Sequence, residues 1–159
     1  MQGPFGFPDS ALLGRLSHSG GRRVRMLRPY FYEIDAVGVA PAAANPTNVI
    51  VLIEGARPFL WMATTWYAYP GANANTNNTQ PIPDVSVALT MGAEALSQAP
   101  IALTALGGAP MAESKRLVEP FWLPGTTTIK ASFYNNEAAA TGGTYTIRLV
   151  LIGICGEEA

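Results

Sequence analysis

The chain has 159 residues, of which 48% are hydrophobic and 13% are charged, with a formal net charge of −1. Disorder throughout is excluded, because it needs low hydrophobicity and high charge, and the near-neutral charge gives no overall bias toward nucleic acid or acidic membranes. The single cysteine, Cys155, excludes an internal disulfide framework. No apolar run approaches the roughly 20 residues that a membrane helix needs. A surface with so few charges is expected to be covered by another molecule.

The first 28 residues are predicted to form a flexible basic arm. They hold five of the ten basic residues and one acid, so the arm carries a net +4 and the remainder a net −5. Glycines make this segment flexible, and the charge balance favours contact with the acidic body of a neighbouring subunit. A solvated tail and contact with nucleic acid phosphates are the alternatives. The predicted arm contacts are Phe5, Phe7, Arg22, Arg23, Arg25 and Arg28.

The remainder, residues 29–159, is predicted to be one β-sandwich domain. Residues 30–36 alternate with the period of a half-buried strand. Residues 144–154 form the strongest strand pattern in the chain, with their odd-numbered apolar side chains on one face. Further strands are predicted over residues 48–54, 59–69, 84–90, 101–105 and 126–134.

The connections between these strands are rich in Pro, Gly and Asn. Residues 70–83 show no apolar period, which predicts an exposed loop. Its candidate contact residues are Asn73, Asn75, Asn77 and Asn78. A short helical turn is expected within residues 111–118, and residues 120–124 form an apolar clamp between two prolines. No long amphipathic helix separates the strands, so the predicted fold is all-β, an antiparallel, jelly-roll-like sandwich with an extended N-terminal arm.

Residues suited to catalysis or metal binding are scarce. The one histidine, His18, lies in the Gly-flanked arm, which is a poor holder for a catalytic base. One His and one Cys cannot supply the four clustered ligands of a zinc site. Glu33 and Asp35 would share a strand face, but this spacing is typical of a solvated face. We therefore predict no catalytic residue, metal or cofactor, and an enzyme is disfavoured.

The aromatic residues allow either packing or sugar stacking. Trp61 and Trp66 are an odd number of residues apart, so a regular strand would turn them to opposite faces. Packing in a core or an interface is the favoured role for both tryptophans. A carbohydrate-binding module is the alternative, and it would use Tyr67, Tyr69 and the asparagine-rich loop.

Several segments together resemble a known group of proteins. These segments are Ile53–Gly55, Pro58–Trp61, Pro120–Pro124, the Asn135–Asn136 pair and the closing strand Tyr145–Gly153. In this order they resemble the small β-sandwich structural proteins that tailed bacteriophages encode in their head and tail gene clusters. The resemblance covers about residues 48–154 and includes no catalytic signature.

The resemblance implies a virion structural protein that assembles by subunit contacts, as a trimer or ring. The expected role is a capsid decoration, or cement, protein that stabilises the head. Its partners would be copies of itself and the major capsid protein, with no membrane partner and with nucleic acid disfavoured. The expected location is the virion, assembled in the host cytoplasm. A tail, baseplate or fibre-attachment component is the alternative within this group.

Overall fold

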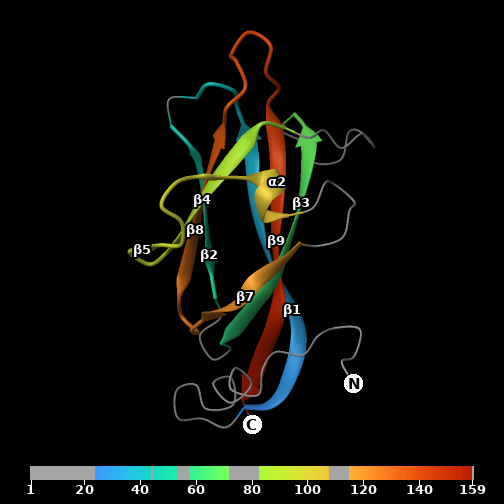
Figure 1. Ribbon diagram of the computed structural model, residues 1–159, viewed down its shortest axis with the longest axis vertical. Helices are drawn as coiled ribbons and strands as arrows, with labels where there is room; N and C mark the ends of the chain where they lie inside the picture. Colours follow the sequence, from blue (N-terminus) through green and yellow to red (C-terminus); the bar gives the residue numbers. More distant parts are fainter. Residues whose placement is uncertain (1–23, 44, 54–57, 72–82, 108–114, 159) are drawn as a thin grey trace.

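The protein folds as an all-β sandwich of two antiparallel sheets packed together, as the strand pattern predicts. The structure is a computed structural model, which describes residues 24–43, 45–53, 58–71, 83–107 and 115–158. Figure 1 shows the two longest strands running along the long axis, with the start of β1 and the end of β9 side by side at one end. Among the described residues no helix is long and apolar enough to cross a membrane.

The first sheet, called sheet A, has the strand order β1-β9-β3-β7. Its strands are β1 (Val24–Val39), β9 (Tyr145–Glu158), β3 (Phe59–Pro70) and β7 (Lys115–Leu123). The two longest strands, β1 and β9, pair along almost their whole length and form the blue and red ribbon that runs down Figure 1. This pairing joins the beginning and the end of the described chain.

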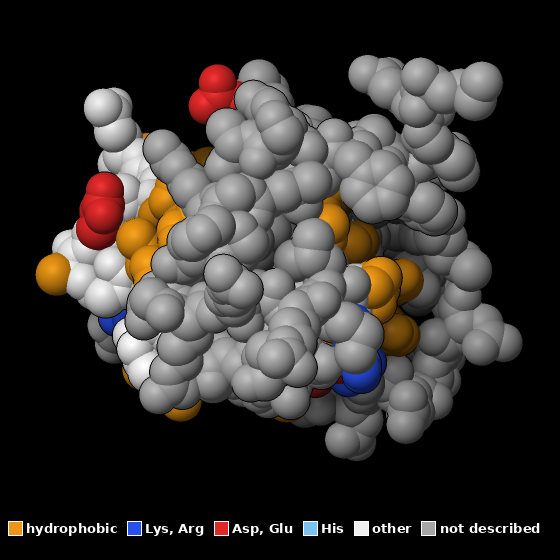
Figure 2. All heavy atoms as spheres, turned by 90° about the horizontal axis from the view of Figure 1, so that it is seen from below, with side chains coloured by type: hydrophobic (Ala, Val, Ile, Leu, Met, Phe, Trp, Pro, Cys, Tyr) orange, Lys and Arg blue, Asp and Glu red, His pale blue; other side chains and the backbone are white. Residues whose placement is uncertain are grey.

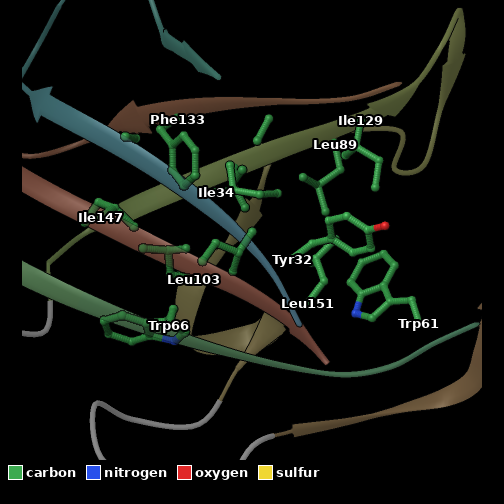
Figure 3. Close-up of a cluster of buried hydrophobic side chains, with 14 of the residues drawn as sticks. Tyr32, Ile34, Trp61, Trp66, Leu89, Leu103, Ile129, Phe133, Ile147 and Leu151 are labelled. Atoms are coloured by element: carbon green, nitrogen blue, oxygen red, sulfur yellow. The ribbon is translucent and has the colours of Figure 1, made fainter. Parts of the chain in front are cut away.

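The second sheet, called sheet B, has the order β2-β8-β4-β5, and β6 also pairs with β4. Its strands are β2 (Thr47–Leu52), β8 (Thr128–Asn135), β4 (Val85–Met91), β5 (Glu94–Ala95) and β6 (Ile101–Ala102). A four-residue helix, α2 (Leu103–Leu106), follows β6 directly. Its Leu103 is buried in the core between the sheets (Figure 3).

The core consists of the inward side chains of both sheets. On β9, Ile147, Leu149 and Leu151 are fully buried, which confirms the predicted apolar face of that strand. Phe133 from sheet B and Ile34 from sheet A point into the same cluster in Figure 3. Burying side chains of this size contributes about 1.5–3 kcal/mol each, so this cluster is the main source of stability.

A β-bulge in β3 corrects the prediction that Trp61 and Trp66 face opposite sides. The register between β3 and its neighbours shifts between Trp61 and Ala63, so Met62 is an extra residue. An extra residue reverses the alternation of everything that follows it. Both tryptophans are therefore buried in the core, with exposed fractions of 5% and 0%, and Figure 3 shows both on the same ribbon.

Several boundaries also differ from the sequence prediction, and residues 103–105 of the strand predicted over 101–105 lie in α2. β1 begins at Val24, so residues 24–28 lie in a strand paired with the end of β9 and not in the predicted arm. Where a helical turn was expected, the chain enters β7 at Lys115. β7 pairs with β3 and includes the predicted apolar clamp. Pro120 is compatible with β7 because that strand is an edge of sheet A, where one row of N–H groups needs no partner.

Candidate functional sites on the two outer sheet faces

The residues predicted to make arm and loop contacts fall mostly outside the described chain. Arg25 lies in β1, and Arg28 is exposed on the same strand beside Cys155 of β9. Outside the described residues are Phe5, Phe7, Arg22, Arg23, Asn73, Asn75, Asn77 and Asn78. Their contacts therefore stay predictions.

The outer face of sheet A contains a hollow of about 460 Å³. We call it the sheet A groove. Its lining residues come from β1, β3 and β9: Phe31, Glu33, Thr65, Tyr67, Tyr69, Arg148, Val150 and Ile152. β9 forms the floor because it lies between β1 and β3 in the sheet, and side chains of the two flanking strands form the walls.

Strand periodicity and the bulge together determine which side chains enter this groove. On β1 the buried residues Tyr32 and Ile34 alternate with the exposed Phe31 and Glu33. On β3 the bulge turns Trp66 inward, and its neighbour Tyr67 consequently lines the groove. Without the bulge, the tyrosines of β3 would face the core. The same irregularity therefore fills the core and supplies the aromatic wall.

An ion-pair cluster lies at one end of the groove. Arg148 donates two hydrogen bonds to the carboxylate of Asp35, from Nε at 2.8 Å and from Nη2 at 2.9 Å. Arg148 Nη1 lies 3.7 Å from Glu33 Oε2. The hydrogen bond to Asp35, together with attraction from both carboxylates, raises the pKa of Arg148 above its usual value. One arginine facing two carboxylates leaves this end of the groove with a net charge of −1.

The outer face of sheet B has a different chemical character. Lys130 is the one charged residue in β2, β4 and β8. Ile50 and Leu52 of β2 are exposed by 67% and 58%, and Tyr134 of β8 by 37%. Small polar side chains fill much of the remainder, as where Ser132 Oγ lies 2.6 Å from Asn48 Oδ1. This face is therefore nearly uncharged and partly apolar.

β2 forms the outer edge of sheet B. It pairs with β8 on one side, and no described strand pairs with it on the other. Its six residues include no charged residue and no proline, the two devices that commonly protect an edge strand. β2 thus offers both an unpaired backbone edge and exposed apolar side chains.

A second hollow, of about 300 Å³, lies beside β7 at the margin of the core. Trp61, Leu89, Leu117 and Phe121 contribute to its apolar lining, and Glu119 adds one carboxylate. The Trp61 and Phe121 rings meet nearly edge to face, with centroids 6.4 Å apart. Trp61 and Leu89 belong to the buried core, and Leu117 packs against it, so the hollow is an opening at the margin of the core rather than a separately built site.

The next question is where the candidate residues for catalysis or metal binding lie in the fold. Glu33 and Asp35 share the outer face of sheet A, as their spacing predicts, and both lie beside Arg148. Cys155 is buried in the core, and His18 lies outside the described chain. Within the part of the chain that the structure describes, no three His, Cys, Asp or Glu side chains cluster as metal ligands would.

A scan of protein-family models and searches of curated proteins and solved structures found no match to the chain.

Sequence reasoning named Tyr67 and Tyr69 as candidate sugar contacts but not the groove that they line, and it missed the exposed apolar side chains of β2. In β2, four consecutive apolar residues conceal which side chains face outward, so Ile50 and Leu52 carried no signal. The pairing of Arg148 with Asp35 joins residues 113 positions apart. For the β1 wall of the groove a sequence signal exists, because the alternation along β1 places Phe31 on the outward face.

Proposed function

We propose that the chain is a virion structural subunit of the capsid-decoration type, which acts through contacts between subunits. The observation that supports this role best is the exposed apolar edge strand β2, with Ile50 and Leu52 on its outer face. An uncharged edge strand with exposed apolar side chains is a template for pairing with another chain, and such surfaces mark interaction sites.

The wider surface also suits assembly. Figure 2 views the molecule from below, along its long axis, and shows hydrophobic side chains of the described residues reaching the surface in separate groups. Of the described residues, the charged side chains in this view lie at scattered points. A nearly neutral chain has weak mutual repulsion between copies, so association driven by apolar burial meets little electrostatic opposition.

The charge asymmetry supports contact between the N-terminal segment of one copy and the body of another. Residues 1–23, which precede β1, carry +2 against −3 for the remainder. A segment of 23 residues spans up to about 80 Å when extended, enough to cross a neighbouring subunit. A second contact made through such a segment becomes intramolecular once the first has formed, which raises the overall affinity for a lattice.

The proposal is tested by charging the β2 surface. We expect Ile50→Lys/Leu52→Lys to weaken self-association and binding to virion particles stripped of this protein by at least tenfold. Phe31→Lys is the matched control, because Phe31 is 55% exposed on the opposite outer face. Light scattering after size-exclusion chromatography gives the mass, and co-sedimentation with stripped particles gives the binding.

The outcomes separate the alternatives. Wild-type protein that binds stripped heads, with loss only in the β2 variant, supports a decoration role. Binding confined to tails or baseplates supports the tail-associated alternative. A wild-type protein that stays monomeric and binds no particle overturns the virion proposal.

A further inference from the structure

We propose that the sheet A groove binds a neutral saccharide. The inference is independent of the virion role, since it rests on the face opposite to β2. The hollow of about 460 Å³ lies within the roughly 300–1,000 Å³ typical of small-molecule sites. Its lining combines aromatic rings with a few polar groups, the composition that such sites share.

The aromatic residues supply stacking surfaces. Phe31 comes from β1, whereas Tyr67 and Tyr69 come from β3, on the other side of the β9 floor. Residues two apart on a strand share a face at a separation of about 7 Å, so the two tyrosines form a continuous wall. The apolar C–H face of a sugar ring packs against such rings, while their hydroxyls remain available for hydrogen bonds.

The polar residues match hydroxyl groups. Asp35 holds Arg148 through two hydrogen bonds, so the guanidinium is fixed before any ligand arrives. The 3.7 Å between Arg148 Nη1 and Glu33 Oε2 is too long for a direct hydrogen bond. A hydroxyl can donate to Glu33 and accept from Arg148 at the same time. A sugar hydroxyl at this position would satisfy both groups.

The charge and polarity of the groove select among ligand classes. Two carboxylates already face Arg148, so a phosphate or a uronic acid would meet a net negative site. A purely apolar partner would remove water from Glu33 and Arg148 and return no hydrogen bonds, which costs free energy. A neutral polyhydroxylated ligand meets neither penalty.

The experiment titrates the full-length protein with neutral trisaccharides: maltotriose, cellotriose, mannotriose, laminaritriose and chitotriose. Isothermal calorimetry measures affinity, and ¹H–¹⁵N NMR shifts locate the site. We expect saturable binding of at least one, weakened tenfold or more by Tyr67→Ala. Tyr134→Ala is the matched control, because Tyr134 is an exposed tyrosine on the outer face of sheet B. This variant should bind the trisaccharide as tightly as the wild type does.

A second variant keeps the test valid if Tyr67→Ala folds poorly. Glu33→Gln retains the size of an exposed side chain and should weaken binding several-fold. Saturable binding of none of the five sugars overturns the proposal, as does equal loss in the Tyr67 and Tyr134 variants. Equally tight binding of a hyaluronan oligosaccharide overturns the preference for neutral ligands. The virion proposal is judged separately, by the Ile50 and Leu52 variant.

Discussion

The two outer faces of this sandwich back onto one core but differ in chemistry. The face of sheet A is hollowed, with aromatic walls and an arginine held between carboxylates. The face of sheet B has one lysine on its three main strands and an exposed apolar edge. Inward side chains are restricted by close packing, whereas outward ones are not. The outer faces are therefore where the two sheets are able to acquire different functions.

The largest expected effect comes from disturbing the bulge that shapes sheet A. Gly153 lies opposite Trp61, and a Cβ there would overlap the Leu60 carbonyl oxygen and come within 2.6 Å of the Phe59 ring. We expect Gly153→Ala to lower the free energy of unfolding by about 3 kcal/mol, at the upper end of the range for overpacked cores. Urea denaturation monitored by tryptophan fluorescence measures this change.

The control for this prediction is Gly71→Ala. Gly71 has a φ of 77°, but a Cβ there would meet nothing within 4 Å, so only the left-handed backbone is penalised, by about 1 kcal/mol. Equal destabilisation by the two variants would mean that the close approach at Gly153 does not matter. The bulge would then be less constrained than its packing indicates.

A smaller effect is expected from the ion pair that distinguishes the two faces. Asp35→Asn removes the charge that holds Arg148, yet both side chains are more than a third exposed. We therefore expect a loss of about 0.5 kcal/mol, decreasing as salt screens the interaction. Lys130→Met on sheet B should change stability by a few tenths of a kcal/mol at most. Thermal melts at low and high salt compare the two, and a salt-independent loss in Asp35→Asn would contradict an electrostatic origin.

The smallest effect concerns the loop that joins the two sheets. Tyr145 of β9 donates its hydroxyl to Glu137, with oxygens 2.9 and 3.1 Å away. Burial, together with this hydrogen bond and the negative charge of Glu137, raises the pKa of Tyr145 above its usual 10.0. Because the pKa of Tyr145 is raised in the folded state, the protonated phenol stabilises the folded protein fully below about pH 10. This stabilisation is lost as the pH rises through the folded-state pKa.

Tyr145→Phe tests this pH dependence. Wild-type protein should lose more unfolding free energy than the variant as the pH rises above 10, because only the wild type has this ionisable phenol. Urea titrations at pH 8 and at several values above pH 10 measure the difference. Parallel curves for the two proteins would show that Tyr145 ionises equally readily in the folded and unfolded chains.

Local patterns were sufficient for the fold class and for most strands. Alternation in β1 and β9 identified the inward faces, because a period of two is a property of each strand alone. The same patterns indicated that Glu33 and Asp35 share a face. They also mark Tyr67 and Tyr69 as neighbours on one side of β3, although not which side.

Long-range pairing was needed for everything that depends on register. The bulge at Met62 is a property of the pairing between β3 and β9 and not of β3 alone. It places both tryptophans in the core and Tyr67 in the groove, whereas regular alternation along β3 would place Trp61 and Trp66 on opposite faces. Pairing with β3 made a strand of residues that a local pattern assigned to a helical turn. In β2, burial of Val49 and Val51 against the core left Ile50 and Leu52 exposed. The sheet face on which a side chain lies depends on how its strand pairs with its neighbours. That pairing is established only when the sheets form and pack together.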